Sequence, residues 1–295
     1  MSEKTVHIPV MLSEILHWLS PTPGQIFVDG TLGGGGHTRE IALRVAPEGR
    51  VISLDRDPQA LARAEETLRG MCVTVAESNF SDLPAVLKQL NIPKVDGILL
   101  DLGLSSDQLA DDARGFSFHS EGPLDLRFNP AEGRPAWMLL QTMRENQLAD
   151  LIYEYGEERY SRRIAKKIVE SRRESPIRTA KDLAELVRRC VPFSRHETID
   201  RATRTFQALR IAVNREMESL ETVLKCIPEC VRPGGRVAIL SFHSLEDRQV
   251  KEAFRDDLRY EVLAKKPIVA EEEEISRNPR SRSAKLRVAK IAPRP

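Results

Sequence analysis

The stretch "FVDGTLGGGGHT", residues 27–38, decides the fold of this protein, because four consecutive glycines stand between an apolar strand-like segment and a helix-like segment. In that context free backbone N–H groups and the dipole of the following helix attract an anion. A glycine run of this length between a strand and a helix indicates a binding loop rather than a plain flexible connection.

The chain that follows the loop alternates apolar segments with helix-length segments. Strands are expected over residues 26–29, 50–55, 72–77 and 95–103, and helices between them over residues 37–45, 58–70 and 82–90. This βαβαβ succession predicts a parallel sheet with right-handed crossovers. The fourth strand is rich enough in aliphatic residues to be buried on both faces.

The alternation stops after the fourth strand. Residues from about 105 to 135 are rich in Gly, Pro, Asp and Phe, helical segments follow up to about 225, and strand patterns return at 236–242 and 285–291. We therefore expect a sheet domain in two parts, 1–108 and 205–295, interrupted by a helical substrate-binding insertion over 109–204. The insertion leaves from the carboxyl end of the fourth strand, beside the edge at which such sheets bind ligands.

The composition limits the class of protein. With 295 residues, 41% of them hydrophobic, the chain can bury a sizeable core. The first residues lack the apolar region of a signal peptide and no 18-residue apolar run occurs, so we expect a cytoplasmic protein without membrane contact. Cys72, Cys190, Cys226 and Cys230 are too few and too irregular for a disulfide framework or a complete zinc shell, so reduced thiols and no metal are expected.

Two common glycine fingerprints do not fit the loop. A Walker phosphate loop needs a lysine after its last glycine, and this stretch contains none, which excludes ATP binding of that kind. A dinucleotide loop needs G-x-G-x-x-G, but the frames that start at Gly33 and Gly34 end on Thr38 and Arg39. An NAD-dependent oxidoreductase is therefore disfavoured, although it stays open as an alternative.

S-adenosylmethionine is the remaining common ligand of such a loop, because its amino acid carboxylate can use the same amides. Its ribose would need an acceptor at the end of the second strand, where Asp55 lies 22 positions after Gly33. Asp57, directly before Pro58, suits the cap of the next helix and leaves Asp55 for the hydroxyls. Phe80 could pack on the adenine or belong to the core, and the sequence leaves both open.

Asp101 ends the fourth strand and is expected to face the crevice where the strand order reverses. Methyl transfer from a sulfonium requires the enzyme mainly to position the nucleophile and to accommodate its proton. Asp101, helped by the Leu102 carbonyl, could orient an exocyclic amine and hold the charge that develops on nitrogen. Methylation of a pyrimidine carbon usually needs an attacking cysteine, and none is expected near this crevice, so nitrogen is the predicted acceptor.

Local charge points to a polyanionic partner, although the net charge is only +1. Residues 159–204 contain 14 Lys or Arg against six Asp or Glu, and the chain from 275 onward contains seven Lys or Arg and no acid. A solvated helix face would explain any one of these residues, but together they favour contact with a phosphate backbone. The candidate RNA-binding residues are Arg162, Arg163, Lys166, Lys167, Arg204, Arg280 and Arg282. Phe116, Phe118 and Phe128 could stack on an unpaired base or form a small loop core.

The chain resembles the ribosomal RNA small subunit methyltransferase H family, also called RsmH or MraW, over nearly its whole length. The resemblance is carried by the order and spacing of "HIPVML", "DGTLGGGGHT", "DRDPQA", "VDGILLDLGLSSDQL", "YGEER", "ATRTFQALRIAVN", "GGRVAILSFHSLEDRQVK" and "NPRSRSAKLRV". This family methylates N4 of a cytosine in the decoding centre of bacterial 16S rRNA. The resemblance therefore implies a substrate that is 16S rRNA within the small ribosomal subunit or a late precursor. A homodimer is a further prediction for this chain.

The resemblance implies an α/β fold, namely a Rossmann-like class I S-adenosylmethionine-dependent methyltransferase sheet with an inserted helical domain. It implies a cofactor site lined by Gly35, Gly36, His37, Asp55, Phe80, Asp101 and Gln108, with Asp101 also the expected catalytic residue. His37 is expected to act through its backbone, and His119 and His243 are expected to be structural. A non-catalytic ribosome assembly factor that kept the cofactor pocket is an alternative from a different class.

This sequence departs from the family pattern at a few positions. Asp200-Arg201 stands where the family usually has His-Pro, Leu126 and Phe128 replace two Met residues, and Asp107 and Ala110 replace Pro and Asp. Most of these positions lie outside the implied cofactor contacts. The departures therefore concern the local fit to RNA more than the reaction.

Overall fold

The computed structural model describes residues 8–193 and 199–293. The chain forms two compact units, the first made of residues 1–103 and 217–295 and the second of residues 104–216. In the described ranges no helix is both long enough and apolar enough to cross a membrane.

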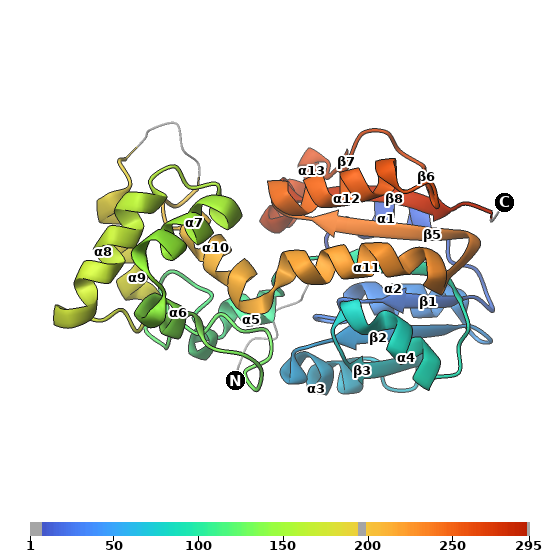
Figure 1. Cartoon of the computed structure of the whole chain (residues 1–295). Coiled ribbons are helices and arrows are strands. Elements are labelled where there is room, and N and C mark those ends of the chain that lie inside the picture. Colours follow the sequence, from blue (N-terminus) through green and yellow to red (C-terminus); the bar gives the residue numbers. More distant parts are fainter. Residues whose placement is uncertain (1–7, 194–198, 294–295) are drawn as a thin grey trace. The chain divides into compact units, whose positions relative to one another are not determined.

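The first unit is built on an eight-stranded sheet in the order β3-β2-β1-β4-β5-β8-β6, in which β7 also pairs with β8 (Figure 1). The strands are β1 (Ile26–Asp29), β2 (Arg50–Asp55), β3 (Val73–Glu77), β4 (Val95–Asp101), β5 (Val231–Ser241), β6 (Tyr260–Val262), β7 (Ile268–Val269) and β8 (Lys285–Ile291). Strands β1 to β5 are parallel, and β8 is antiparallel to β5, β6 and β7. Because the order reverses between β1 and β4, the ligand crevice of such a sheet falls at the carboxyl ends of these two strands.

Helices pack on both faces of this sheet. They are α1 (Leu12–Leu19), α2 (Gly36–Val45), α3 (Pro58–Thr67), α4 (Leu83–Gln89), α11 (Glu216–Cys230), α12 (Ser244–Asp256) and α13 (Glu272–Arg277). Val28 on β1 belongs to a core shared with α4, α11 and α12, whereas its neighbour Phe27 belongs to a core shared with α1 and α2. Successive strand residues point to opposite faces, so the continuous apolar strands supply both cores.

The second unit is helical and has a core of its own. Its helices are α5 (Ser106–Ala110), α6 (Ala136–Thr142), α7 (Glu145–Gly156), α8 (Ser161–Glu174), α9 (Ala180–Cys190) and α10 (Thr203–Asn214). Leu148 and Ile152 on α7, Ile164 on α8, Leu183 on α9 and Leu209 on α10 are buried together in that core. This burial at helical spacing is what an amphipathic helix requires.

Most predicted strands and helices of the sheet domain are confirmed within a few residues. The helical unit extends beyond the expected insertion of residues 109–204, because α10 packs into the core of that unit. Among the helical segments expected up to about residue 225, α10 and α11 are separated at Arg215, which adopts a left-handed conformation with φ 52°. Strand β5 begins at Val231, before the strand pattern expected at 236–242, and a register shift against β4 accommodates the extra residues.

Gly30 shows how closely the glycine loop approaches the sheet. Its N–H donates to the Leu99 carbonyl at 2.9 Å, and a Cβ added here would overlap with Leu100 Cδ2 and lie 3.1 Å from the Cβ of Phe80. Overpacking of this kind forces neighbouring side chains out of their preferred conformations.

We therefore expect Gly30→Ala to lower the free energy of unfolding by about 1–3 kcal/mol, measured by urea denaturation. The control is Ala131→Gly, at an exposed loop position, which is expected to change the free energy of unfolding far less. Gly133→Ala would not serve as a control, because Gly133 has a positive φ of 64°. An unchanged midpoint in Gly30→Ala would show that the loop can move away from Leu100 and Phe80.

Candidate active site

The glycine loop runs from the end of β1 to the start of α2. Gly35 is the N-cap of α2, with φ 76° and ψ 7°, a left-handed conformation that favours glycine. The cap makes no side-chain hydrogen bond, and the first turn of α2 contains no acidic residue. The first amides of a helix have no carbonyl within the helix to pair with, so this end of α2 suits a carboxylate brought by a ligand.

Asp55, at the end of β2, is tied to this loop. Its Oδ2 accepts the N–H of Gly33 at 2.9 Å, and its Oδ1 accepts the N–H of Asp57 at 2.9 Å. Burial raises the pKa of Asp55 to about 6, and the two backbone N–H donors oppose that rise. Asp57 caps α3 by accepting the N–H of Gln59 at 3.0 Å, with Pro58 at the first helical position, so the predicted capping is confirmed.

Phe80 opens the short 3₁₀ helix Phe80–Asp82 after β3. Its side chain is partly buried against the core formed with α4 and α11, and it faces the position of Gly30. Of the two interpretations of Phe80, the structure thus supports packing against the core. Stacking of the adenine on this residue stays a prediction.

A buried polar network beneath the loop was not anticipated from the sequence. Asp29, 1% exposed, accepts the Thr38 hydroxyl at 2.7 Å and the Thr31 N–H at 3.1 Å. The Thr38 hydroxyl also lies 2.9 Å from that of Ser53 on β2, and the Thr31 hydroxyl accepts the N–H of Asp101 at 2.7 Å. The sequence signal for this network was Asp29, a polar residue at the end of a buried strand, because a buried polar group needs hydrogen-bond partners. The network fixes the loop to three neighbouring strands.

Asp101 ends β4 beside the buried imidazole of His37. Asp101 Oδ2 lies 3.6 Å from His37 Nδ1, and the two side chains are 19% and 5% exposed. Asp101 Oδ1 is buried and has no hydrogen-bond partner among the residues that the structure describes. Burial raises the pKa of Asp101 to about 6, while His37 and Arg280 act in the opposite direction. A buried carboxylate oxygen without a partner marks a place where a ligand is expected to donate a hydrogen bond.

Gln108 lies in the second unit. It is the third residue of α5, where its backbone N–H donates to the Ser105 hydroxyl at 3.1 Å and its side chain accepts the Ser105 N–H at 3.0 Å. This capping box gives Gln108 a local structural role at the start of α5. Its predicted contact with the cofactor stays a prediction.

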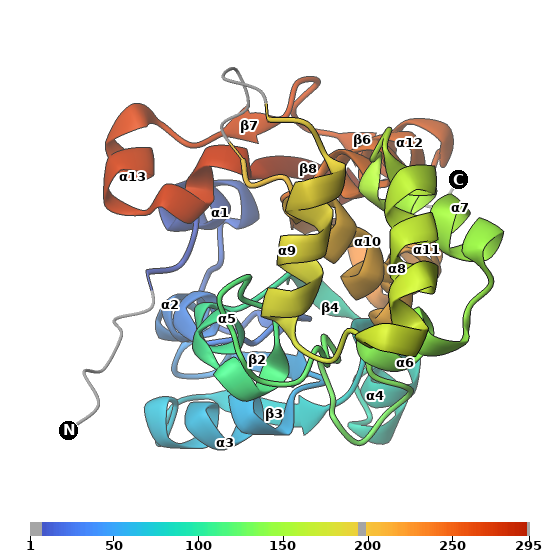
Figure 2. The ribbon, with the colours of Figure 1, turned by 90° about the vertical axis from the view of Figure 1, so that its left-hand side faces the viewer.

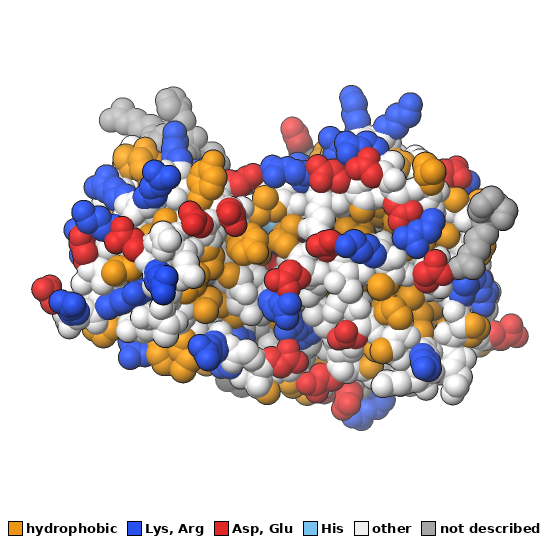
Figure 3. All heavy atoms as spheres, in the orientation of Figure 1, with side chains coloured by type: hydrophobic (Ala, Val, Ile, Leu, Met, Phe, Trp, Pro, Cys, Tyr) orange, Lys and Arg blue, Asp and Glu red, His pale blue; other side chains and the backbone are white. Residues whose placement is uncertain are grey.

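Lys and Arg side chains gather over α8 of the second unit, with a few Asp and Glu side chains between them (Figure 3). The predicted RNA-binding residues of α8 are all exposed and lie on one face of the helix: Arg162, Arg163, Lys166 and Lys167. Glu170 pairs with Lys167 at 2.6 Å and approaches Lys166 at 4.0 Å. Arg204 on α10 is partly buried. Arg195 and Glu197 of the basic block lie outside the described residues.

The other two predicted RNA-binding residues lie in the first unit, on the 3₁₀ helix Pro279–Ser283. Arg282 is exposed, whereas Arg280 is partly buried and close enough to Asp101 to lower the pKa of that carboxyl. Arg280 therefore contributes positive charge to the candidate active site. The sequence predicted only a contact with RNA for this residue, because it lies in a basic tail.

The three phenylalanines of the 105–135 stretch form a loop core. Phe116 stacks on Phe128 with ring centroids 6.0 Å apart, and Phe118 meets Phe206 of α10 edge-on at 4.9 Å. Phe116 is 5% exposed. Of the two alternatives that the sequence left open, the structure therefore favours the core over stacking on a base.

Asp200 and Arg201, which depart from the family pattern, hold the start of α10. Asp200 accepts three hydrogen bonds from Arg188 on α9, at 3.2, 3.1 and 2.7 Å, and also accepts the Ala202 N–H at 2.8 Å. Arg201 donates to the carbonyls of Arg188 and Val191. Asp200 and Arg201 thus hold the turn before α10 against the end of α9.

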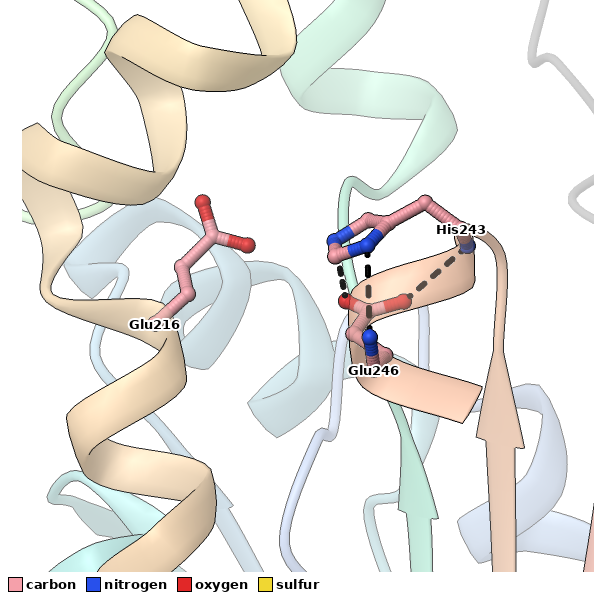
Figure 4. Close-up of side chains that lie close together, drawn as sticks. All are labelled: Glu216, His243 and Glu246. Carbon is pink, nitrogen blue, oxygen red and sulfur yellow. Dashed lines mark hydrogen bonds and ion pairs between the residues drawn. The ribbon is translucent and has the colours of Figure 1, made fainter. Parts of the chain in front are cut away.

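His243 and Glu246 form the N-terminal cap of α12 (Figure 4). The Glu246 carboxylate accepts the N–H of Phe242 at 2.9 Å and lies 3.1 Å from His243 Nε2. Both side chains are buried, at 8% and 3% exposure. The predicted structural role of His243 fits this arrangement.

These residues fit S-adenosylmethionine. The uncapped start of α2 suits its carboxylate, Asp55 stands where a ribose acceptor is needed, and the buried oxygen of Asp101 lacks a partner among the described residues. The donor supplies a methyl group that is already activated on a sulfonium. The protein residues then have to hold the acceptor in line and accept its proton.

The fold and this site define a Rossmann-like class I methyltransferase, and its methyl donor is S-adenosylmethionine. Comparison with known proteins gives the particular group: the sequence profile of the MraW methylase family matches residues 4–292, so the chain belongs to that family. The predicted fold class, family and cofactor are thus confirmed, and the alternative of an NAD-dependent oxidoreductase is disfavoured further.

Similar proteins match along nearly their whole length. A protein of Rhodopirellula baltica named ribosomal RNA small subunit methyltransferase H is 49% identical over 97% of this chain and 92% of its own length. Proteins with the same name from a Cyanothece strain and from Trichlorobacter lovleyi are 50% and 46% identical, over 96% and 97% of this chain and 94% and 98% of their own lengths.

Proposed function

We propose that this chain transfers a methyl group from S-adenosylmethionine to N4 of a cytosine in the decoding centre of bacterial 16S rRNA. The observation that carries the reaction type is the buried, unpartnered Oδ1 of Asp101 at the carboxyl end of β4, within the described part of the chain. A carboxylate there can accept an N–H of an exocyclic amine and oppose the charge that develops on nitrogen. The shared name of the relatives supports ribosomal RNA of the small subunit as substrate.

We further propose that the substrate is the assembled small subunit or a late precursor. The exposed cations of α8 provide a surface that a phosphate backbone can contact. Arg204, Arg280 and Arg282 are proposed as additional contacts, and a homodimer stays a prediction.

The test uses small subunits from cells with and without this protein. Purified protein and S-adenosylmethionine carrying a labelled methyl group are added, and the modified nucleoside is identified by digestion and mass spectrometry. We expect label at one cytosine N4, in subunits from deficient cells only. Label at a pyrimidine carbon or a ribose oxygen would overturn the assignment, and donor binding without incorporation would identify a non-catalytic assembly factor.

A further inference from the structure

Both nitrogens of the His37 imidazole have a defined neighbour. Nε2 lies 3.0 Å from the carbonyl oxygen of Val10, and Nδ1 lies 3.6 Å from Asp101 Oδ2. The ring is only 5% exposed, so water does not surround it. The sequence indicated only a backbone role for His37 at the start of α2, and these side-chain contacts go beyond that role.

The Val10 contact decides which nitrogen carries the proton of the neutral ring. A carbonyl oxygen can only accept a hydrogen bond, so Nε2 must donate to it. Nδ1 then presents its lone pair toward Asp101. A lone pair and an ionised carboxylate that face each other are both acceptors, so the arrangement favours a second proton on the ring, at Nδ1, where its positive charge faces the Asp101 carboxylate.

The Val10 carbonyl is itself held in place. The next residue, Met11, is fully buried in a left-handed conformation with φ 52°, and its N–H donates to Glu274 of α13 at 2.7 Å. Asn278 donates to the Ile8 carbonyl at 3.2 Å. Figure 2 shows α13 beside α1, in line with these bonds. Residues 8–11 thus form a fixed support for the His37 ring.

Four charged or titratable groups from different elements act on Asp101. His37 of α2 and Arg280 of the 3₁₀ helix favour its ionised form, whereas Asp29 of β1 and Glu246 of α12 disfavour it. His37 is the stronger of the two favourable partners. The imidazole is therefore placed to change the proton affinity of the carboxylate that faces the acceptor.

We propose that Asp101 and His37 act as a pair: a protonated His37 Nδ1 faces Asp101 Oδ2 at 3.6 Å and keeps the carboxylate ionised, and Asp101 Oδ1 takes the proton from the methylated amine. This inference deepens the proposed function and rests on it for the identity of the acceptor. The amine nitrogen forms the N–C bond with its lone pair, and the C–S bond breaks with its electron pair left on sulfur. The nitrogen then holds one excess proton, which passes to Asp101 and leaves a neutral methylated amine.

The variant that tests this is His37→Gln. Its side-chain amide can still donate to the Val10 carbonyl, which preserves the packing, but it offers no proton acceptor at the position of Nδ1. His17→Gln is the matched control, because His17 is exposed on α1 and contacts Trp18. Calorimetry with S-adenosylmethionine is expected to give the same affinity for His17→Gln as for the parent.

The first measurement is NMR of the folded, full-length protein without substrate. Nitrogen shifts of labelled histidine are expected to show His37 protonated at Nε2 when neutral. The carboxyl carbon of Asp101 is expected to titrate near pH 6 in the parent and at higher pH in His37→Gln, because a positively charged imidazolium lowers the pKa of Asp101 and glutamine carries no charge. A neutral ring protonated at Nδ1, or an unchanged Asp101 titration in His37→Gln, would overturn the proposal.

The second measurement is the single-turnover rate of methyl transfer against pH. Asp101 accepts a proton only when ionised, so the rate falls as pH drops through its pKa. In His37→Gln we expect a rate about 10- to 100-fold lower at neutral pH and an acid limb moved to higher pH. If the rate in His37→Gln falls equally at every pH and the acid limb of the profile does not move, His37 has only a structural role. If the parent fails to methylate small subunits, the proposed function falls, while the NMR titration still decides the pairing.

Discussion

Replacement of Asp101 by asparagine is expected to lower the single-turnover rate of methyl transfer by a factor of about 10² to 10⁴ at neutral pH. Asparagine has nearly the same shape, but it cannot accept the proton that the amine loses, and it carries no charge to oppose the charge on nitrogen. Rapid mixing of enzyme, labelled donor and small subunits measures this step. A rate within a few-fold of the parent would remove Asp101 from the reaction.

The same substitution is expected to stabilise the fold at neutral pH. Burial raises the pKa of Asp101 from 3.8 to about 6, so the folded state binds a proton more tightly than the unfolded state does. The tighter proton binding by folded Asp101 stabilises the folded state fully at a pH below 3.8, the pKa of the carboxyl in the unfolded chain. This stabilisation is lost as the pH rises through about 6. At neutral pH the ionised carboxylate therefore costs up to about 3 kcal/mol, which asparagine removes.

Chemical unfolding of Asp101→Asn against pH tests the stability effect. We expect the free energy of unfolding of Asp101→Asn to exceed that of the parent at neutral pH, and the difference to shrink as the pH falls below about 6. Asp256→Asn is the control, because Asp256 is 60% exposed and pairs with Arg255 on the surface. A variant that is inactive and also less stable at neutral pH would indicate damage to the site instead of loss of the proton acceptor.

Replacement of Asp55 by alanine is expected to weaken binding of S-adenosylmethionine about 100-fold. The proposed hydrogen bonds to the ribose hydroxyls disappear, and a hydrogen bond to a charged group contributes about 1.5–3 kcal/mol. The Gly33 amide also loses its acceptor, so the loop is no longer held against β2. Calorimetry with the donor and with its demethylated product measures the change.

Asp57→Asn is the matched control for Asp55→Ala. Asparagine caps a helix about as well as aspartate, so α3 and the affinity for the donor are expected to be unchanged. In the parent, affinity is expected to fall as pH drops through about 6, because the Asp55 carboxylate then becomes protonated. Parent-like affinity in Asp55→Ala would place the ribose elsewhere.

The sequence by itself determined the class of fold, and it predicted that Asp55 and Asp101 lie at the carboxyl edge of the sheet. Apolar strands at regular intervals define a parallel sheet, and the glycine run after the first strand indicates a place where the backbone approaches a ligand. Asp55 and Asp101 were found because each is the last residue of a buried strand, and parallel strands bring their carboxyl ends to one edge. Local periodicity carries all of this information.

The tertiary structure alone decided which side chains meet. That His37 lies between Val10 and Asp101, that Arg280 acts on Asp101, and that Asp29, Thr31 and Thr38 tie the loop to three strands depends on packing between segments distant in sequence. The same applies to the phenylalanines, for which sequence allowed both a loop core and a base platform. Sequence patterns record which residues are buried, whereas the direction and partner of a buried polar group follow from the three-dimensional path of the chain.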